Sequence, residues 1–189
     1  DEISFDMEVV MSFKPFQSEV FRNEVKGCSE IYGEGPFSVI AVHEDHGPSG
    51  GMSALERCIK VHCESGLFSE IVIVCRKENE SRVREIASAS AAGVPWKSVI
   101  GGAERQDSVR NALEALDAGV DFVSIHDAAR CFVTTEILSA GVECALKNGS
   151  AVTVFPVVDT VKQTAGDIVV RTLDRNNIVL VQTPQIFAA

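Results

Sequence analysis

Basic residues are scarce in this sequence, with 17 Lys and Arg against 27 Asp and Glu and a formal net charge of -10. A surface so acidic repels a phosphate backbone, which argues against nucleic-acid binding. The sequence also lacks any apolar run near the roughly 20 residues that a membrane helix needs, so we expect no membrane span. Residues 1–4 lack the basic, apolar and small-residue order of a signal peptide, which favours a cytoplasmic location.

Two familiar cysteine and glycine patterns are missing as well. No C-x-x-C pair and no zinc-finger spacing occurs among the six cysteines, which are Cys28, Cys58, Cys63, Cys75, Cys131 and Cys144. We therefore expect free thiols in a reducing compartment rather than a disulfide scaffold. No G-x-G-x-x-G follows the first predicted strand, which argues against a dinucleotide-dependent dehydrogenase.

What is present fits one compact domain with an extension. The chain has 189 residues, of which 46% are hydrophobic and 23% charged, as in an ordinary globular domain. Residues 1–36 carry scattered phenylalanines without a sustained period, and we interpret them as an N-terminal extension. Residues 37–189 form the predicted domain.

Within that domain, strand and helix patterns alternate. Short apolar runs of strand length occur at 38–42, 71–75, 99–100, 122–126 and 151–158. Apolar residues at helical spacing occur between them, at 52–63, 80–92, 108–116 and 135–147. This order predicts an α/β fold with a doubly wound, mostly parallel sheet. After residue 158 the pattern changes to a predicted hairpin, which we expect to project as a β-arm over 159–178 and to mediate a homodimer.

Ligands of open α/β sheets bind at the carboxyl ends of the strands, so residues that follow the apolar runs are the candidates for a site. The run beginning at Gly101 and Gly102 lets the backbone approach a ligand, and the helix after it offers N–H groups to an anion. The same run also fits an ordinary turn with a helix cap at Asp107 or Ser108, and spacing alone favours that interpretation.

The run H-D-A-A-R at 126–130 ends another predicted strand. Asp127 is placed to hold a divalent cation, and Arg130 offers a planar fork to a phosphate. An Asp–Arg ion pair that caps the next helix explains the same residues equally well. His126 is interpreted as a hydrogen-bonded histidine at a strand end rather than a ligand. The polar residues around Pro184, in Q-T-P-Q-I-F, form a third candidate together with the runs at 159–162 and 172–175, and turn chemistry is the alternative interpretation.

Taken together, five runs carry a family resemblance. They are G-G-A-E-R-Q-D-S-V at 101–109, H-D-A-A-R at 126–130, D-T-V-K at 159–162, T-L-D-R-N at 172–176 and Q-T-P-Q-I-F at 182–187. In order and spacing they resemble the 2-C-methyl-D-erythritol 4-phosphate cytidylyltransferases, enzymes of non-mevalonate isoprenoid biosynthesis. The related pentitol-phosphate cytidylyltransferases share much of the pattern, but H-D-A-A-R and D-T-V-K favour the isoprenoid branch.

The resemblance implies a Rossmann-like nucleotidyltransferase that joins CTP and methylerythritol phosphate to CDP-methylerythritol and pyrophosphate, with Mg²⁺. It implies that the cytidine part of CTP contacts Gly102, Ala103 and Ser108. It places Asp127, as catalytic residue and metal ligand, and Ala128 near the ribose and phosphates. Methylerythritol phosphate would be bound by Arg130 and Thr183. Thr160 and the catalytic Arg175, both on the arm, would reach the neighbouring subunit's site.

The sequence departs from the family in its first loop. The family has a Gly-rich loop with an Arg and a later Lys that stabilise the transition state, whereas no Lys or Arg occurs here between Ser38 and Arg57. His43 and His46 in this loop fit a solvated segment better than a metal pair. The chain ends at Ala189, before the family's further substrate-positioning Lys. We therefore expect slow turnover, with a catalytically silent nucleotide-binding homologue as the alternative.

Overall fold

The structure is a computed structural model that describes residues 8–9, 37–42 and 52–189. Its elements are β1 (Glu8–Val9), β2 (Phe37–Val42), α2 (Ala54–Ser65), β3 (Glu70–Cys75), η1 (Lys77–Asn79), α3 (Glu80–Ser90), β4 (Trp96–Ile100), α4 (Arg105–Glu114), β5 (Phe122–Asp127), α5 (Thr135–Asn148), β6 (Ser150–Pro156), β7 (Lys162–Ala165), β8 (Ile168–Thr172), η2 (Arg175–Asn177) and β9 (Val179–Ala188). Among the described residues, no helix has the length and apolarity to cross a membrane.

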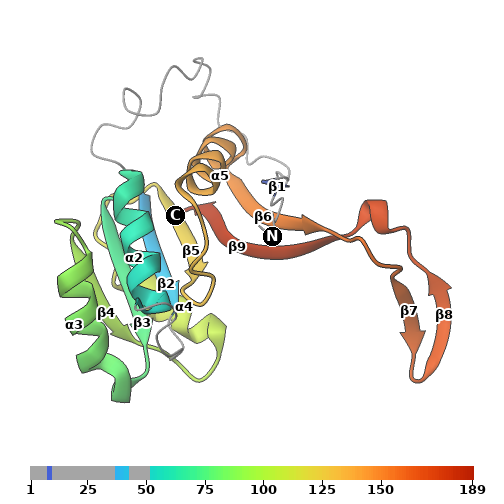
Figure 1. Ribbon diagram of the computed structural model, residues 1–189, viewed down its shortest axis with the longest axis horizontal. Helices are drawn as coiled ribbons and strands as arrows, with labels where there is room; N and C mark the ends of the chain where they lie inside the picture. Colours follow the sequence, from blue (N-terminus) through green and yellow to red (C-terminus); the bar gives the residue numbers. More distant parts are fainter. Residues whose placement is uncertain (1–7, 10–36, 43–51) are drawn as a thin grey trace.

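A seven-stranded sheet forms the centre of the domain, in the order β1-β6-β9-β5-β2-β3-β4 (Figure 1). Neighbouring strands from β5 through β2 and β3 to β4 are parallel. β9 is antiparallel to both β5 and β6, so β6 runs in the same direction as the parallel strands. The predicted α/β fold with a mostly parallel sheet is therefore confirmed. The N-terminal extension lies outside the described residues except for β1, which pairs with β6.

Helices cover both faces of the parallel strands, and β3 shows how the sequence achieves this. All six residues of β3 are buried, as expected for a strand between two layers. Ile71, Ile73 and Cys75 belong to the main core with residues of α2, α3 and α5. Val72 and Val74 point to the other face, where they pack with Ala112 of α4. The alternation of side chains along one strand thus feeds two cores.

The helices end where the sequence carries ordinary capping residues. Ser53 Oγ accepts a hydrogen bond from the backbone N–H of Glu56 at 3.1 Å and caps the start of α2. Gly66, with φ 65°, ends the same helix in the left-handed conformation that favours glycine.

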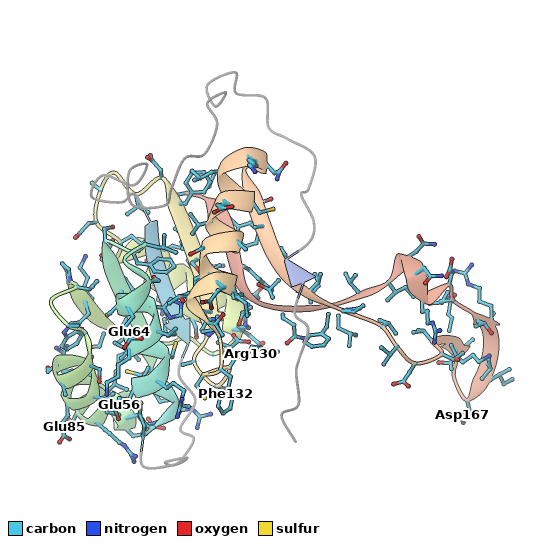
Figure 2. All side chains as sticks on the ribbon, turned by 45° about the horizontal axis from the view of Figure 1, so that its top comes forward. Glu56, Glu64, Glu85, Arg130, Phe132 and Asp167 are labelled. Carbon is cyan, nitrogen blue, oxygen red and sulfur yellow. The ribbon has the colours of Figure 1, made fainter. Side chains whose placement is uncertain are left out.

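The arm is a two-stranded extension away from the domain (Figure 1). β7 and β8 pair antiparallel, and Gly166 with φ 58° lies in the turn between them. Figure 2 shows Asp167 at the far tip of the arm and Arg130 and Phe132 in the body of the domain. The predicted hairpin is confirmed.

The alternative interpretation of Q-T-P-Q-I-F as turn chemistry is wrong, because these residues lie within β9. The register between β6 and β9 shifts between Val152 and Val154, so that Gln182, Thr183 and Pro184 oppose the single residue Thr153. Pro184 is tolerated inside a strand at such an irregularity, since it has no N–H to donate to the ladder. The irregularity brings Thr183 to the carboxyl end of β5, where its side chain is buried against His126 and the Asp127 backbone.

Candidate functional site

A cavity of about 410 Å³ opens at the carboxyl ends of β3, β4 and β5. This is the edge where ligands of parallel α/β sheets bind. Its described lining residues are Val74, Cys75, Arg76, Gly101, Gly102, Ala103, Glu104, Arg105, Ser108, Asp127 and Ala129. Four of the predicted site residues, Gly102, Ala103, Ser108 and Asp127, therefore share one cavity.

The turn at Gly101 and Gly102 is built for close packing. A Cβ on Gly101 would lie 2.8 Å from Ser108 Oγ, and one on Gly102 would lie 2.3 Å from Cβ of Asp107, so neither position has room for a side chain. The Gly102 N–H donates to Ser108 Oγ at 3.1 Å, which holds the turn against α4. The two glycines thus put main-chain atoms on the cavity wall.

The helix after this turn begins earlier than expected. α4 starts at Arg105, with Glu104 as its N-cap, so the predicted cap at Asp107 or Ser108 is wrong. Asp107 instead reaches back from the first turn and accepts the Glu104 N–H at 3.2 Å, in the manner of a capping box. The earlier start places the Arg105 guanidinium at the cavity, where the positive end of the helix dipole also lies.

Asp127 lies between two guanidinium groups. Arg105 Nη2 donates to Asp127 Oδ1 at 3.1 Å, and Arg130 Nε donates to Oδ2 at 3.4 Å. Arg130 also donates to Gln182 Oε1 on β9. The Asp–Arg pair is real, yet it does not cap the next helix, because α5 is capped by Thr134. Arg105 was not singled out in the sequence, since nothing local signals that residues 22 positions apart meet at one edge of the sheet.

His126 and Thr183 are buried directly behind Asp127. Thr183 Oγ1 accepts the Asp127 N–H at 3.1 Å and lies 3.2 Å from His126 Nδ1. His126 Nε2 lies 3.3 Å from the carbonyl oxygen of Arg130. Both ring nitrogens therefore have partners, and the interpretation of His126 as a hydrogen-bonded histidine is confirmed. Burial, with a smaller contribution from His62, lowers the pKa of His126 to about 3, so its ring is neutral.

The remaining predicted residues lie elsewhere. Ala128 is fully buried, and its neighbour Ala129 lines the cavity. Thr160 and Arg175 are exposed at the base of the arm, outside the described lining of the cavity, and Arg175 donates to the carbonyl oxygen of Val158. The predicted loop at 43–51, including His43 and His46, lies outside the described residues.

The described residues hold no group of three or more His, Cys, Asp or Glu side chains placed to bind a metal ion. Asp127, the last residue of β5, brings a carboxylate to the cavity, and Mg²⁺ is often held by one or two carboxylates together with substrate phosphates. The donor set therefore fits Mg²⁺ that arrives with a nucleotide better than a resident metal.

The five described cysteines are free, as predicted; they are Cys58, Cys63, Cys75, Cys131 and Cys144. Burial raises the pKa of Cys58 to about 12, which keeps this thiol protonated and unreactive.

The α/β fold, with its cavity at the strand ends, is the Rossmann-like fold that nucleotidyltransferases use. Comparison with known families agrees: the model of the 2-C-methyl-D-erythritol 4-phosphate cytidylyltransferase (IspD) family matches residues 49–189. The chain therefore belongs to this family, which is a family of nucleotidyltransferase enzymes.

Curated relatives support the assignment. The enzyme of this name from Solibacter usitatus is 39% identical over 141 residues, which cover 72% of this chain and 58% of the relative. The Halalkalibacterium halodurans enzyme is 37% identical over 138 residues, covering 73% of this chain and 60% of the relative. The chain thus spans less than two thirds of the length of these relatives.

Solved structures show the same fold. A 4-diphosphocytidyl-2C-methyl-D-erythritol synthase from Anaerococcus prevotii matches with a TM-score of 0.75 and 28% identity, covering 80% of this chain and 70% of that one. The cytidylyltransferase from Thermus thermophilus matches with a TM-score of 0.61 and 30% identity, covering 79% and 69%.

Proposed function

We propose that this protein is a cytidylyltransferase that joins CTP and 2-C-methyl-D-erythritol 4-phosphate. A phosphate oxygen of the polyol phosphate attacks the α-phosphorus of CTP, the bond to the β-phosphate breaks, and pyrophosphate leaves. Such transfer needs positioning and charge neutralisation rather than a covalent nucleophile. The observation that carries the proposal is the cavity at the strand ends, with a side-chain-free turn on one wall and Asp127 between two arginines on another.

The residues divide the substrates between them. The turn of Gly102 and Ala103, held by Ser108 of α4, suits the flat cytosine ring of CTP, because main-chain groups can lie against a ring where no side chain intervenes. Asp127 would hold Mg²⁺ together with phosphate oxygens, beside Ala128. Bound Mg²⁺ supplies charge neutralisation to the phosphates. Arg105 and Arg76, which also line the cavity, add positive charge that the first loop lacks.

The polyol phosphate would lie on the other side of Asp127. Arg130 is oriented by Asp127 and Gln182, which presents part of its guanidinium to a phosphate. Thr183 on β9 is buried behind Asp127, where its hydroxyl accepts the Asp127 N–H. Thr160 and Arg175 are exposed on the arm and do not belong to the described lining of the cavity in their own subunit. This supports a homodimer in which they complete the partner's site. The free thiols fit a cytoplasmic protein.

The test is pyrophosphate release by the full chain with CTP, methylerythritol phosphate and Mg²⁺. We expect CTP-dependent turnover below about 1 s⁻¹, because each missing preorganised donor costs on the order of 10² to 10³ in rate. Replacing residues 43–51 with a basic Gly-rich loop should raise it. Calorimetric binding of Mg·CTP without release in either form would select the silent homologue. Faster release with a pentitol phosphate would select the related branch.

A further inference from the structure

His126 joins three parts of the site, and the function proposed above gives it no role. Its side chain is fully buried at the end of β5. Nδ1 of the ring faces Thr183 Oγ1 on β9, at 3.2 Å, and Nε2 faces the carbonyl oxygen of Arg130, at 3.3 Å. The ring therefore connects β9, through Thr183, with the loop that follows β5, through Arg130.

Counting protons fixes the tautomer of the ring. Thr183 Oγ1 accepts the Asp127 N–H, so its own hydroxyl proton is free to be donated to His126 Nδ1. Nδ1 must then be unprotonated, and the single proton of a neutral ring is on Nε2, from which it is donated to the Arg130 carbonyl. In the other tautomer the Nε2 lone pair would face a carbonyl oxygen, and the buried pair would be repulsive.

These hydrogen bonds lie just beyond the end of the backbone pairing between β5 and β9. The last paired residues of β5 and β9 are Ile125 and Gln185, and the backbone beyond them has no further ladder contact between the two strands. The Asp127–Thr183 and Thr183–His126 bonds join the strands past that point. The Arg130 N–H donates to the Asp127 carbonyl at 2.9 Å, which closes the turn that follows.

We propose that His126, as its Nε2–H tautomer, is a positioning residue that locks Thr183 and the Asp127–Arg130 turn in the geometry that receives the phosphates. Asp127 and Arg130 project from this turn, and a change of its backbone would move both side chains together. The inference deepens the proposed function and rests on it for the identity of the ligand, while the hydrogen-bond arrangement stands on the structure alone.

The chain offers a matched control in His62. Its side chain is also buried, and the centroid of its ring lies 5.1 Å from that of His126. His62 is held through Nδ1, which donates to the carbonyl oxygen of Cys58 at 2.8 Å within α2. It has no hydrogen bond to Thr183 or to the turn among the described residues. His62→Leu and His126→Leu therefore each replace a buried imidazole ring with the same apolar side chain, but only the second removes the hydrogen bonds to Thr183 and Arg130.

Two measurements on the full chain test the lock without turnover. Long-range ¹H–¹⁵N spectra of the histidine rings should show the proton of His126 on Nε2 at neutral pH; a proton on Nδ1 would overturn the proposal. Hydrogen exchange of the Asp127 amide should be faster in His126→Leu than in the parent and unchanged in His62→Leu. Equal exchange in all three proteins would also overturn it.

Turnover tests positioning. His126→Leu should lower kcat by about 10- to 100-fold, as for other residues that orient a ligating group, with KM for CTP changed far less. His126→Asn can still accept the Thr183 proton in place of Nδ1 and should recover part of kcat. Equal losses in His62→Leu and His126→Leu, or no recovery with Asn, would contradict the proposal. A parent chain with no turnover would refute the proposed function instead, and the spectra and exchange would still decide the lock.

Discussion

A carboxylate at the mouth of a phosphate site repels its ligand unless its charge is compensated. At Asp127 the compensation comes from Arg105 and Arg130, one on each carboxylate oxygen. Both arginine side chains are about half exposed, so each pair on its own contributes little to stability. Their contribution is to the position of the charges. When a bound cation replaces the arginines as the partner of Asp127, the two guanidinium groups are left next to the incoming phosphates.

Replacing Asp127 with Asn tests whether that carboxylate binds a cation. A hard divalent ion prefers carboxylate oxygen, so we expect the affinity for Mg·CTP to fall roughly tenfold or more.

Asp121→Asn is the matched control, since Asp121 directly precedes β5 and lies at the opposite end of the same strand. Calorimetry compares the three proteins. If Asp127→Asn binds Mg·CTP as tightly as the parent, Asp127 is only a structural partner of the two arginines.

His62 makes the folded state sensitive to acid. Burial lowers its pKa to about 4, from an ordinary value of 6.5, so between these values the unfolded chain binds a proton that the folded chain does not. Stability therefore rises with pH in this window and is lost as pH falls from 6.5 toward 4. For this one group the loss between pH 7 and pH 5 is about 2 kcal/mol.

We expect His62→Leu to remove this part of the acid sensitivity. The variant gives up the Nδ1–H bond to the Cys58 carbonyl oxygen but also removes Nε2, which is buried with no hydrogen-bond partner among the described residues, so we expect a small net change in stability at pH 7. Urea unfolding at pH 5 and pH 7 should show a smaller difference for the variant than for the parent. An identical pH dependence in both proteins would mean that His62 is protonated in the folded state or neutral in both states.

At the scale of elements, run length and alternation in the sequence predict the sheet and its helices well. Strands such as β3 are continuous apolar runs, and buried strands between two helix layers require that pattern. Two elements differ from the prediction, one through pairing with a residue remote in sequence and the other through a local helix cap. Q-T-P-Q-I-F lies in a strand because its Pro faces a register shift opposite Thr153, and α4 starts early because Asp107 caps it from inside. Neither signal can be separated from turn chemistry without the partner.

The start of α4 gives a prediction about Gly102. In Gly102→Ala the new Cβ would clash with Asp107, so either the capping box or the turn must shift, at a cost of about 1–3 kcal/mol. Because the same turn forms the cavity wall, CTP binding should weaken as well. Gly66→Ala is the control: it strains a positive φ at the end of α2 with nothing within 4 Å, and should lower stability alone. Calorimetry and urea unfolding separate the two effects. Unchanged CTP affinity in Gly102→Ala would remove the turn from the binding site.

At the scale of the whole molecule, the arm leaves apolar surface uncovered. Val158, Ile168, Val169, Val170, Leu180 and Val181 are each more than half exposed. Ile168, Val169 and Val170 lie on β8, Val158 precedes the arm, and Leu180 and Val181 lie at the start of β9. Figure 1 shows β8 away from the helices that cover the sheet. So many exposed apolar side chains on one extension, in an otherwise acidic protein, favour an interface there.

The arm therefore predicts a homodimer, and the prediction can be made specific to it. The parent should sediment as a dimer at micromolar concentration. Val170→Asp places a charge among the exposed apolar residues of β8 and should shift the protein to monomer, because an unpaired carboxylate in an apolar interface is costly to bury. Leu113→Asp is the control, since Leu113 is exposed on α4, outside the arm, and its replacement should leave the dimer intact.

The monomeric Val170→Asp protein should still bind Mg·CTP, whose site lies within one subunit. It should lose turnover if Thr160 and Arg175 act on the partner's substrate. A parent that sediments as a monomer would refute the interface, and a monomeric variant with full turnover would show that each subunit's site is complete without its partner's arm.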